Sequence, residues 1–370
     1  MPVPLDEYPI HQAPISMAYM DTGDRNAYDR CYLNAHDRTG DVFLVTGLGV
    51  YPNLGVIDAY ATVRRGDHQY TIRTSDALSD DRMQQAVGPY RIEIIEPLHK
   101  LRLICDGDDH GVGFDLTWEG SFPVLDEARH TWRRNGRINL DAQRFAQVGT
   151  WAGELRVAGE TLAVTPDHWV GTRDRSWGIR GVGEAEPPGR AGEEPIEGFW
   201  WTYIPMRFED FALVVILQED PDGTRVMNDV CRVFPKESGR RPEQLGWPEI
   251  EIAYTPGTRL PMGATVHFQT RGRKELTMEV ETLGYVALNM GAGYGGDPDW
   301  SHGQWRGRNW VEGGVYDLTD PMVAGRAAFS VIDHVGHATL DGQEGWGLFE
   351  HGCFGRHDPS GFADYLSVAP

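Results

Sequence analysis

The chain has 370 residues, of which 40% are hydrophobic, so it can bury a core and is not an intrinsically disordered protein. It holds 34 Lys and Arg against 55 Asp and Glu, a net charge of −21, and this acidic excess argues against nucleic acids and anionic membranes as partners. The 45 glycines and 23 prolines are spread along the sequence, which favours many turns and few long helices.

The sequence carries no pattern for membrane insertion or secretion. It contains no apolar run of about 18 residues, and residues 1–24 lack the charged and apolar blocks of a signal peptide. The four cysteines lie far apart and form no C-x-x-C pair, which predicts free thiols in a reducing compartment. We therefore expect a cytoplasmic protein.

Short strands separated by turns dominate the pattern. Residues 79–87 favour a helix, but the stretch is short. Apolar runs at 101–105 and 211–217 predict strands, whereas 264–269 and 277–281 alternate apolar and polar residues, as a strand with one wet face does. Hairpin turns are predicted at residues 65–67, 158–160, 222–224 and 341–343.

Residues 181–195 are rich in Gly, Pro and Glu and predict a linker near the midpoint, and residues 235–244 predict a second polar loop. The motif W-x-G-x5-G occurs at Trp151 and again at Trp305, on either side of the linker. We therefore predict an all-β protein of two antiparallel β-barrel or sandwich domains, residues 1–190 and 191–370, that arose by duplication. Concave surfaces at the barrel mouths and between the domains are the places where a small-molecule site is expected, and a homodimer is left open.

Three motifs resemble ligand sites but fit loops or strands better. Residues 291–296 match G-x-G-x-x-G, yet no helical pattern follows, so we interpret them as a flexible loop. Residues 106–111 begin like a calcium loop but have Thr117 at the position that requires Glu, which favours a hairpin turn. His334 and His337 point to opposite faces of a strand unless a bulge intervenes, so we expect no metal site.

Residues 167–180 are the richest in chemistry. On a strand, Arg173, Arg175 and Trp177 share one face, while Asp174 and Ser176 share the other. The arginine face could clamp an anion or an electron-rich ring, or it could seal a barrel end with Trp177 under a stacked arginine.

Aromatic residues recur beside ionisable ones later in the chain. Trp201 and Tyr203 share a strand face that could wall an apolar pocket or simply pack the core. Glu350 follows an apolar pair, so an inward carboxyl there is expected to have a raised pKa, either as a general acid or as a buried partner of an arginine.

With these features in place, the sequence resembles the double-lipocalin, carotenoid-hydratase-like proteins of the calycin class. The resemblance rests on Asp174, Trp177 and Gly178, on the W-x-G elements in both halves and on the late G-W-G-x-x-E, and it spans roughly residues 42–352. It implies two lipocalin-like barrels, a hydrophobic small-molecule substrate in a cavity at or near the domain junction, and no organic cofactor. Arg175 stands where the family has a proton-donating histidine, and the family's downstream tyrosine and aspartate fall near residues 201–203, where the carboxylate is missing.

These observations predict a cofactor-independent acid/base enzyme for a terpenoid or polyketide-like molecule, a hydratase-like lyase or an isomerase or cyclase. The alternatives are a carrier of hydrophobic ligands and a structural module filled by its own side chains. The expected catalytic residues are Asp174 (base or orienting group), Tyr203 (hydrogen-bond donor), His168 or His302 (replacement acid) and Glu350 (acid in the second half). The expected substrate-binding residues are Arg173, Arg175, Trp177, Trp201, Trp305, Asp333 and His334.

Overall fold

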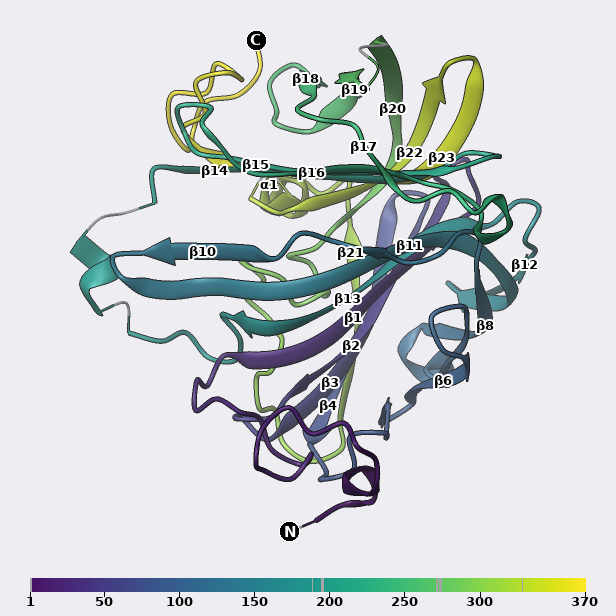
Figure 1. The fold of residues 1–370 in the computed structure, drawn as a ribbon, viewed down its shortest axis with the longest axis vertical. Helices are drawn as coiled ribbons and strands as arrows, with labels where there is room; N and C mark the ends of the chain where they lie inside the picture. Colours follow the sequence, from purple (N-terminus) through teal and green to yellow (C-terminus); the bar gives the residue numbers. More distant parts are fainter. Residues whose placement is uncertain (1, 188, 194–195, 271, 273–274, 328) are drawn as a thin grey trace.

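The computed structural model describes residues 2–370 apart from 188, 194–195, 271, 273–274 and 328, and it consists of two large antiparallel sheets packed face to face (Figure 1). The first sheet has 14 strands: β1 (Ala27–His36), β2 (Val42–Tyr51), β3 (Val56–Arg65), β4 (His68–Ala77), β5 (Ala86–Val87), β6 (Tyr90–Glu96), β7 (Lys100–Cys105), β8 (Val112–Gly120), β9 (Leu125–Asp126), β10 (His130–Arg134), β11 (Arg137–Val157), β12 (Glu160–Val164), β13 (Val170–Arg180) and β21 (Trp310–Asp317). The second has nine: β14 (Gly198–Arg207), β15 (Ala212–Glu219), β16 (Arg225–Val233), β17 (Glu243–Gln244), β18 (Glu249–Tyr254), β19 (Pro261–Gln269), β20 (Glu275–Ala287), β22 (Ile332–Leu340) and β23 (Gln343–Gly355). The all-β prediction is confirmed.

Helical structure is sparse in the described residues. It comprises helix α1 (Pro321–Ala327) and four 3₁₀ turns, Pro4–Glu7, Asp108–His110, Gly189–Glu193 and Lys236–Ser238. The expected helix over 79–87 is wrong: residues 78–85 form a loop and 86–87 form β5, because their side chains supply no apolar stripe to bury. In the described part of the chain, no helix has the length and apolar character needed to cross a membrane.

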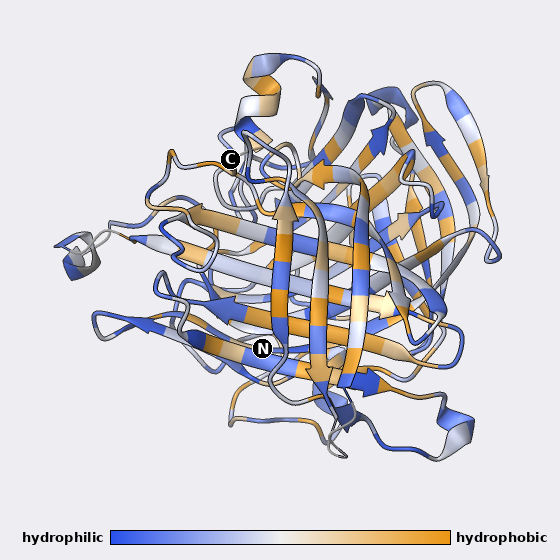
Figure 2. Cartoon of the chain, turned by 90° about the horizontal axis from the view of Figure 1, so that it is seen from above, coloured by the Kyte–Doolittle hydropathy of each residue, from blue (hydrophilic) through white to orange (hydrophobic). Residues whose placement is uncertain are grey.

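Figure 2 shows orange and blue residues alternating along many of the strands. In the described residues this alternation builds three large apolar cores and two smaller ones. One core fills the concave side of the first sheet, with Leu33, Leu103 and Trp151 among its members. A second core fills the second sheet's own curl. A third lies between the two sheets, and Tyr32 of β1 and Trp201 of β14 both belong to it.

The connections follow the turn signals, with one exception in the topology. The chain from β13 to β14 contains the expected linker, of which residues 188 and 194–195 lie outside the described residues. The segment 106–111 is the hairpin between β7 and β8, and 291–296 is a loop. Strand β21, although it follows residue 191, pairs with β4 in the first sheet. The division at residues 190 and 191 stays a prediction.

The two copies of the W-x-G-x5-G motif occupy different structures. Trp151 is fully buried inside β11, whereas Trp305 is 46% exposed in the loop that precedes β21. The motif therefore does not mark equivalent positions in two barrels.

Gly178 shows why glycine follows Trp177 in β13. Its φ is +138°, and a Cβ atom built there would lie 2.1 Å from the carbonyl oxygen of Asp141 on β11. We expect Gly178→Ala to lower the free energy of unfolding by about 2 kcal/mol or more, because the larger residue strains the backbone and pushes β11 away. Denaturant unfolding beside the control Gly23→Ala, which has open space around its Cβ position, checks this; equal midpoints for the two variants would contradict it.

Candidate active site

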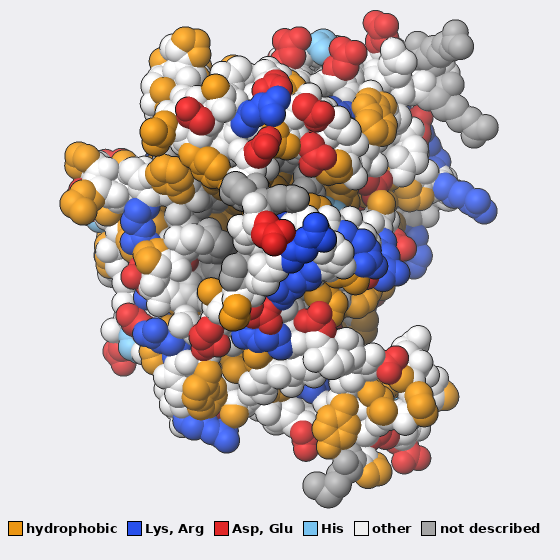
Figure 3. Space-filling view, turned by 90° about the vertical axis from the view of Figure 1, so that its left-hand side faces the viewer, with side chains coloured by type: hydrophobic (Ala, Val, Ile, Leu, Met, Phe, Trp, Pro, Cys, Tyr) orange, Lys and Arg blue, Asp and Glu red, His pale blue; other side chains and the backbone are white. Residues whose placement is uncertain are grey.

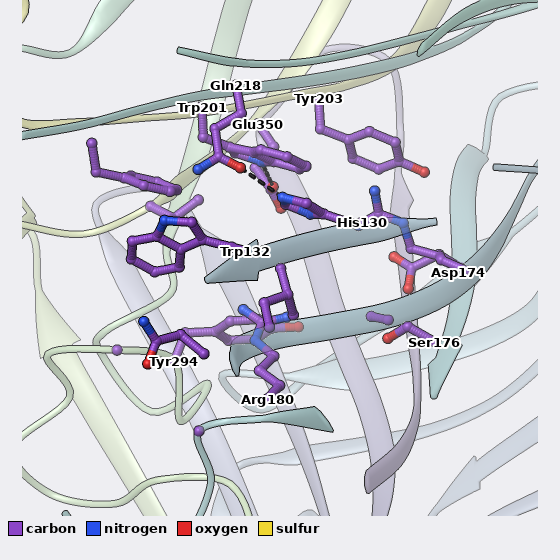
Figure 4. Close-up of a pocket in the computed structure, with 18 of the residues that line it drawn as sticks. His130, Trp132, Asp174, Ser176, Arg180, Trp201, Tyr203, Gln218, Tyr294 and Glu350 are labelled. Carbon is purple, nitrogen blue, oxygen red and sulfur yellow. Dashed lines mark hydrogen bonds between the residues drawn. The ribbon is translucent and has the colours of Figure 1, made fainter. Parts of the chain in front are cut away.

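A cavity of about 520 Å³ lies between the two sheets. Its lower wall comes from β1, β11 and β13, its upper wall from β14, β15 and β23, and β10 runs along it (Figure 4). The lining residues are Tyr28, Arg30, Tyr32, Glu127, Ala128, His130, Trp132, Arg134, Asn139, Leu140, Ala142, Arg144, Asp174, Ser176, Arg180, Gly181, Ile196, Phe199, Trp201, Tyr203, Gln218, Leu288, Tyr294, Gly295, Val331 and Glu350.

The period-two geometry of the strands decides which side chains reach this cavity. On β13, Asp174 and Ser176 point into it, and on neighbouring β1 the residues paired with them, Tyr32 and Arg30, do the same. The intervening residues point to the opposite face, where Cys31 of β1 joins the first core and Arg175 of β13 pairs with Asp29. Each strand therefore directs one polar row toward the cavity and its other row away from it.

Two carboxyl groups meet at the upper wall. Glu350 on β23 lies directly opposite Asp333 on β22 in the strand register, and its carboxyl accepts a hydrogen bond from the indole nitrogen of Trp201. The hydroxyl of Tyr32 donates to Oδ2 of Asp333 over 2.6 Å. Burial, followed by the charge of Glu350, raises the pKa of Asp333 well above its ordinary value. Asp333 therefore holds a proton at neutral pH, because its ionisation would place a second negative charge beside Glu350 in a buried position.

Asp174 supplies a third carboxyl from the opposite sheet. Burial raises its pKa to about 6, and the guanidinium of Arg144 is the main influence in the other direction. The carboxylate of Glu350 also raises the pKa of Asp174, so the two groups sense each other across the cavity. A side chain with this pKa changes protonation state near neutrality, as a general base does.

Glu127 is a fourth carboxyl, which follows β9. Only 3% of the residue is exposed, and burial raises its pKa to about 7. The Nε atom of Arg144 donates to its carboxyl, and the hydroxyl of Tyr203 donates to its Oε1 over 3.4 Å. Arg144 lies in turn 5.0 Å from the ring of Tyr203.

Aromatic and polar rings close the cavity above β10. The ring of His130 stacks on that of Trp201, with centroids 5.8 Å apart and planes 3° apart, and its Nε2 is 2.7 Å from Oε1 of Gln218 (Figure 4). Burial lowers the pKa of His130 to about 4, so this ring is neutral near pH 7. The wall therefore offers flat π faces rather than extra charge.

Comparison with known proteins gives a family but no activity. Residues 3–363 match the model described as Family of unknown function (DUF8625). The chain belongs to this family. No curated protein matches the chain by sequence.

Solved structures that share the fold of this chain include two of similar length. Kievitone hydratase from Nectria haematococca is 15% identical with a TM-score of 0.50, and the match covers 87% of this chain and 88% of that one. A protein from Nitrosomonas europaea assigned as AttH is 12% identical with a TM-score of 0.53, and the match covers 93% of this chain and 98% of that one. The lipocalin-like fold implied by the sequence resemblance is thereby confirmed.

Four of the residues expected at the site line the cavity of this family member: Asp174, Trp201, Tyr203 and Glu350. Asp333 lies immediately behind the lining, where its carboxyl accepts a hydrogen bond from the cavity-lining Tyr32. Their roles in catalysis or binding stay predictions.

His302 lies outside the main cavity, although it is close to it. Its ring packs 4.8 Å from that of Tyr294 and lines a smaller hollow behind it. Burial lowers the pKa of His302 well below its ordinary value, so it carries no proton to donate near neutrality.

The remaining expected residues point elsewhere. Arg173 donates to Gln147, Arg175 pairs with Asp29, and Trp177 is 39% exposed, all on the face of β13 opposite the cavity. His168 is exposed in the turn before β13, Trp305 sits in an exposed loop, and His334 points into the core of the second sheet. These six side chains lie outside the cavity lining, because strand alternation or a loop carries each away from it, and their roles stay predictions.

Sequence reasoning missed Tyr32, Glu127, His130 and the cavity arginines. Glu127 had a usable signal, since it sits two residues after the buried Leu125, at the inward position of an alternating stretch. Among the described residues, no group of three or more His, Cys, Asp and Glu side chains is arranged to hold a metal ion.

Proposed function

We propose that this protein is an acid/base enzyme that adds water to, or removes it from, a hydrophobic small molecule, with isomerisation or cyclisation through the same cation as the related outcome. The observation that carries the proposal is the pair of the buried Asp333, which retains a proton, and the cavity-lining Glu350, which faces Asp174 across a cavity with aromatic walls. A carrier needs the apolar walls but has no use for buried carboxyls, which cost folding energy. Kievitone hydratase carries a hydration activity in its name, which supports the capacity of this fold for such chemistry.

The proposed step uses only side chains of the chain. The carboxyl pair, through Glu350, gives a proton to one carbon of a double bond, and the π electrons form the new C–H bond and leave a cation on the other carbon. The rings of Trp201 and Tyr203 stabilise this cation. Water then adds its oxygen to the cation, and Asp174 takes the proton that the water loses. Proton exchange with solvent restores both groups, and the reverse sequence is a dehydration.

The test begins with the ligand. Native mass spectrometry of protein from its own host identifies an apolar molecule that co-purifies, and incubation in heavy-oxygen water then reports oxygen incorporation. We expect a product that differs from the ligand by one water and carries the heavy oxygen. Recovery of the ligand unaltered after long incubation would favour the carrier and would contradict the proposal.

The pH profile gives a second readout of the same chemistry. Below about pH 6 Asp174 is protonated and cannot accept a proton, so kcat/KM is expected to rise as the pH increases through this range. At higher pH Asp333 loses its proton, and the rate is expected to fall again. A profile that stays flat from about pH 5 to pH 9 would contradict these assignments.

A further inference from the structure

Two arginines at one end of the cavity take no part in the acid/base chemistry. Arg30 on β1 and Arg180 on β13 line both the main cavity and the smaller hollow of about 200 Å³ beside it. Tyr294, Gly181 and Gly295 also belong to both linings. The two guanidinium groups therefore stand at the junction of two connected spaces.

Neither arginine forms a salt bridge with a described carboxylate. In the described part of the chain, no carboxylate forms an ion pair with Arg30 or Arg180, whereas Arg144, in the same cavity, pairs with Glu127. Arg30 is 5% exposed, and a buried guanidinium without a counter-charge is costly unless a ligand supplies one. Burial and the charge of Arg30 lower the pKa of Arg180, and the charge of Glu350 offsets this only in part.

Aromatic residues hold both arginines in place. The Arg30 guanidinium lies 4.9 Å from the ring centroid of Tyr294 and 5.8 Å from that of Tyr28, and Arg180 lies 5.7 Å from Tyr294. The hydroxyl of Tyr51 is within hydrogen-bonding reach of Arg30 and donates to Asp58 over 3.1 Å. The pair is thus oriented in advance, while its charge remains available to a ligand.

The balance of charged side chains in the cavity lining also favours an anionic ligand. The lining holds four arginines, Arg30, Arg134, Arg144 and Arg180, against three carboxyls, Glu127, Asp174 and Glu350. Burial raises the pKa of two of these carboxyls to about 6 and about 7, so positive charge is in excess. Figure 3 shows basic side chains gathered in the middle of the left-hand side of Figure 1, in a chain whose net charge is −21.

We propose that Arg30 and Arg180 form an oxyanion subsite, and that the hydrophobic ligand of this protein carries a carboxylate that these two guanidiniums bind. The planar fork of each guanidinium matches the two oxygens of a carboxylate. Arg30 precedes Tyr32 by two residues on β1, so their Cα atoms lie about 7 Å apart along the strand, and it is the hydroxyl of Tyr32 that bonds Asp333. This places the charged end of the ligand away from the proton donor and its apolar body against the rings. The inference rests on the proposed function only in that the cavity receives a hydrophobic molecule.

A binding experiment separates the subsite from the catalytic proposal. The probes are abietic acid, a diterpenoid carboxylate, and abietinol, the corresponding alcohol, titrated at about pH 8 by calorimetry. We expect the wild type to bind the acid at least about tenfold more tightly than the alcohol. Arg180→Gln and Arg30→Gln should each weaken binding of the acid about tenfold or more and leave binding of the alcohol within about twofold. Thermal unfolding of each variant verifies that it folds. If Arg30→Gln does not fold, Arg180→Gln still tests the subsite, because Arg180 is only half-buried.

The control is Arg133→Gln, which removes the same charge from the exposed side of β10 and should leave both affinities unchanged. Equal binding of acid and alcohol by the wild type, or an unchanged preference in both cavity variants, would overturn the subsite and leave the acid/base proposal standing. Failure of the wild type to bind either probe would overturn the subsite for diterpenoid carboxylates and would also count against a hydrophobic ligand in the cavity.

Discussion

Glu350→Gln is expected to lower kcat/KM by about 10²–10³-fold, because it removes the proton that the Asp333 and Glu350 pair delivers into the cavity. Glutamine has nearly the same shape, and its amide oxygen can still accept the hydrogen bond from Trp201. Ligand affinity should therefore change by less than about threefold, since the loss concerns the transition state. Steady-state kinetics with a separate binding titration measure the two effects.

Asp126→Asn is the matched control for this change. Asp126 lies on β9 next to the site, but its side chain is exposed and accepts from Gln143 at the surface. It should retain the wild-type rate. A Glu350→Gln protein that also retained it would remove the carboxyl pair from the mechanism.

Arg144→Met is expected to destabilise the fold by about 2–2.5 kcal/mol near pH 8 and by only about 1 kcal/mol near pH 5. The reason is Glu127, whose side chain is fully buried and whose pKa is raised to about 7 from 4.5. Near pH 5 its carboxyl is already protonated and needs no counter-charge, whereas near pH 8 the variant must bury a lone carboxylate or keep it protonated against the solvent. Denaturant unfolding at both pH values measures the difference.

The sign follows from linkage. An acid with a raised folded-state pKa contributes stability that is complete below its unfolded pKa and is lost as the pH rises through its folded pKa. Removal of Arg144 raises the pKa of Glu127 further, so the variant loses stability over a wider range of pH than the wild type. The double variant Glu127→Gln with Arg144→Met should recover most of the loss near pH 8. Equal destabilisation by Arg144→Met at both pH values would show that its role is packing alone.

The fold was predictable because its signals are local. A strand that buries one face must alternate apolar and polar residues, and a hairpin needs turn residues. The strand at 264–269 and the turn at 222–224 can therefore be recognised from their own residues, without knowledge of their partners. The expected helix over 79–87 is wrong because its local preference is weak and its side chains form no apolar stripe that a helix could bury.

The site was predictable only in part. Tyr203 and Glu350 stood out because they are polar or ionisable within apolar strands, and both line the cavity. Arg175 and His168 were equally conspicuous, yet one points to the opposite face of β13 and the other sits in an exposed turn. Alternation tells which residues share a face, but it does not tell which face meets the other sheet.

The sequence by itself thus determined that the chain is all-β with an apolar interior, and which residues of a strand share a face. These properties depend on neighbours one to four positions away. Only the packing of one sheet on the other decided the remaining features: the pair of Asp333 and Glu350, the salt bridge of Glu127 and the two arginines without a salt bridge. Asp333 meets Tyr32 across 301 positions, and a carboxyl changes its pKa through burial and through charges that reach it in space, neither of which is written in its neighbours along the chain.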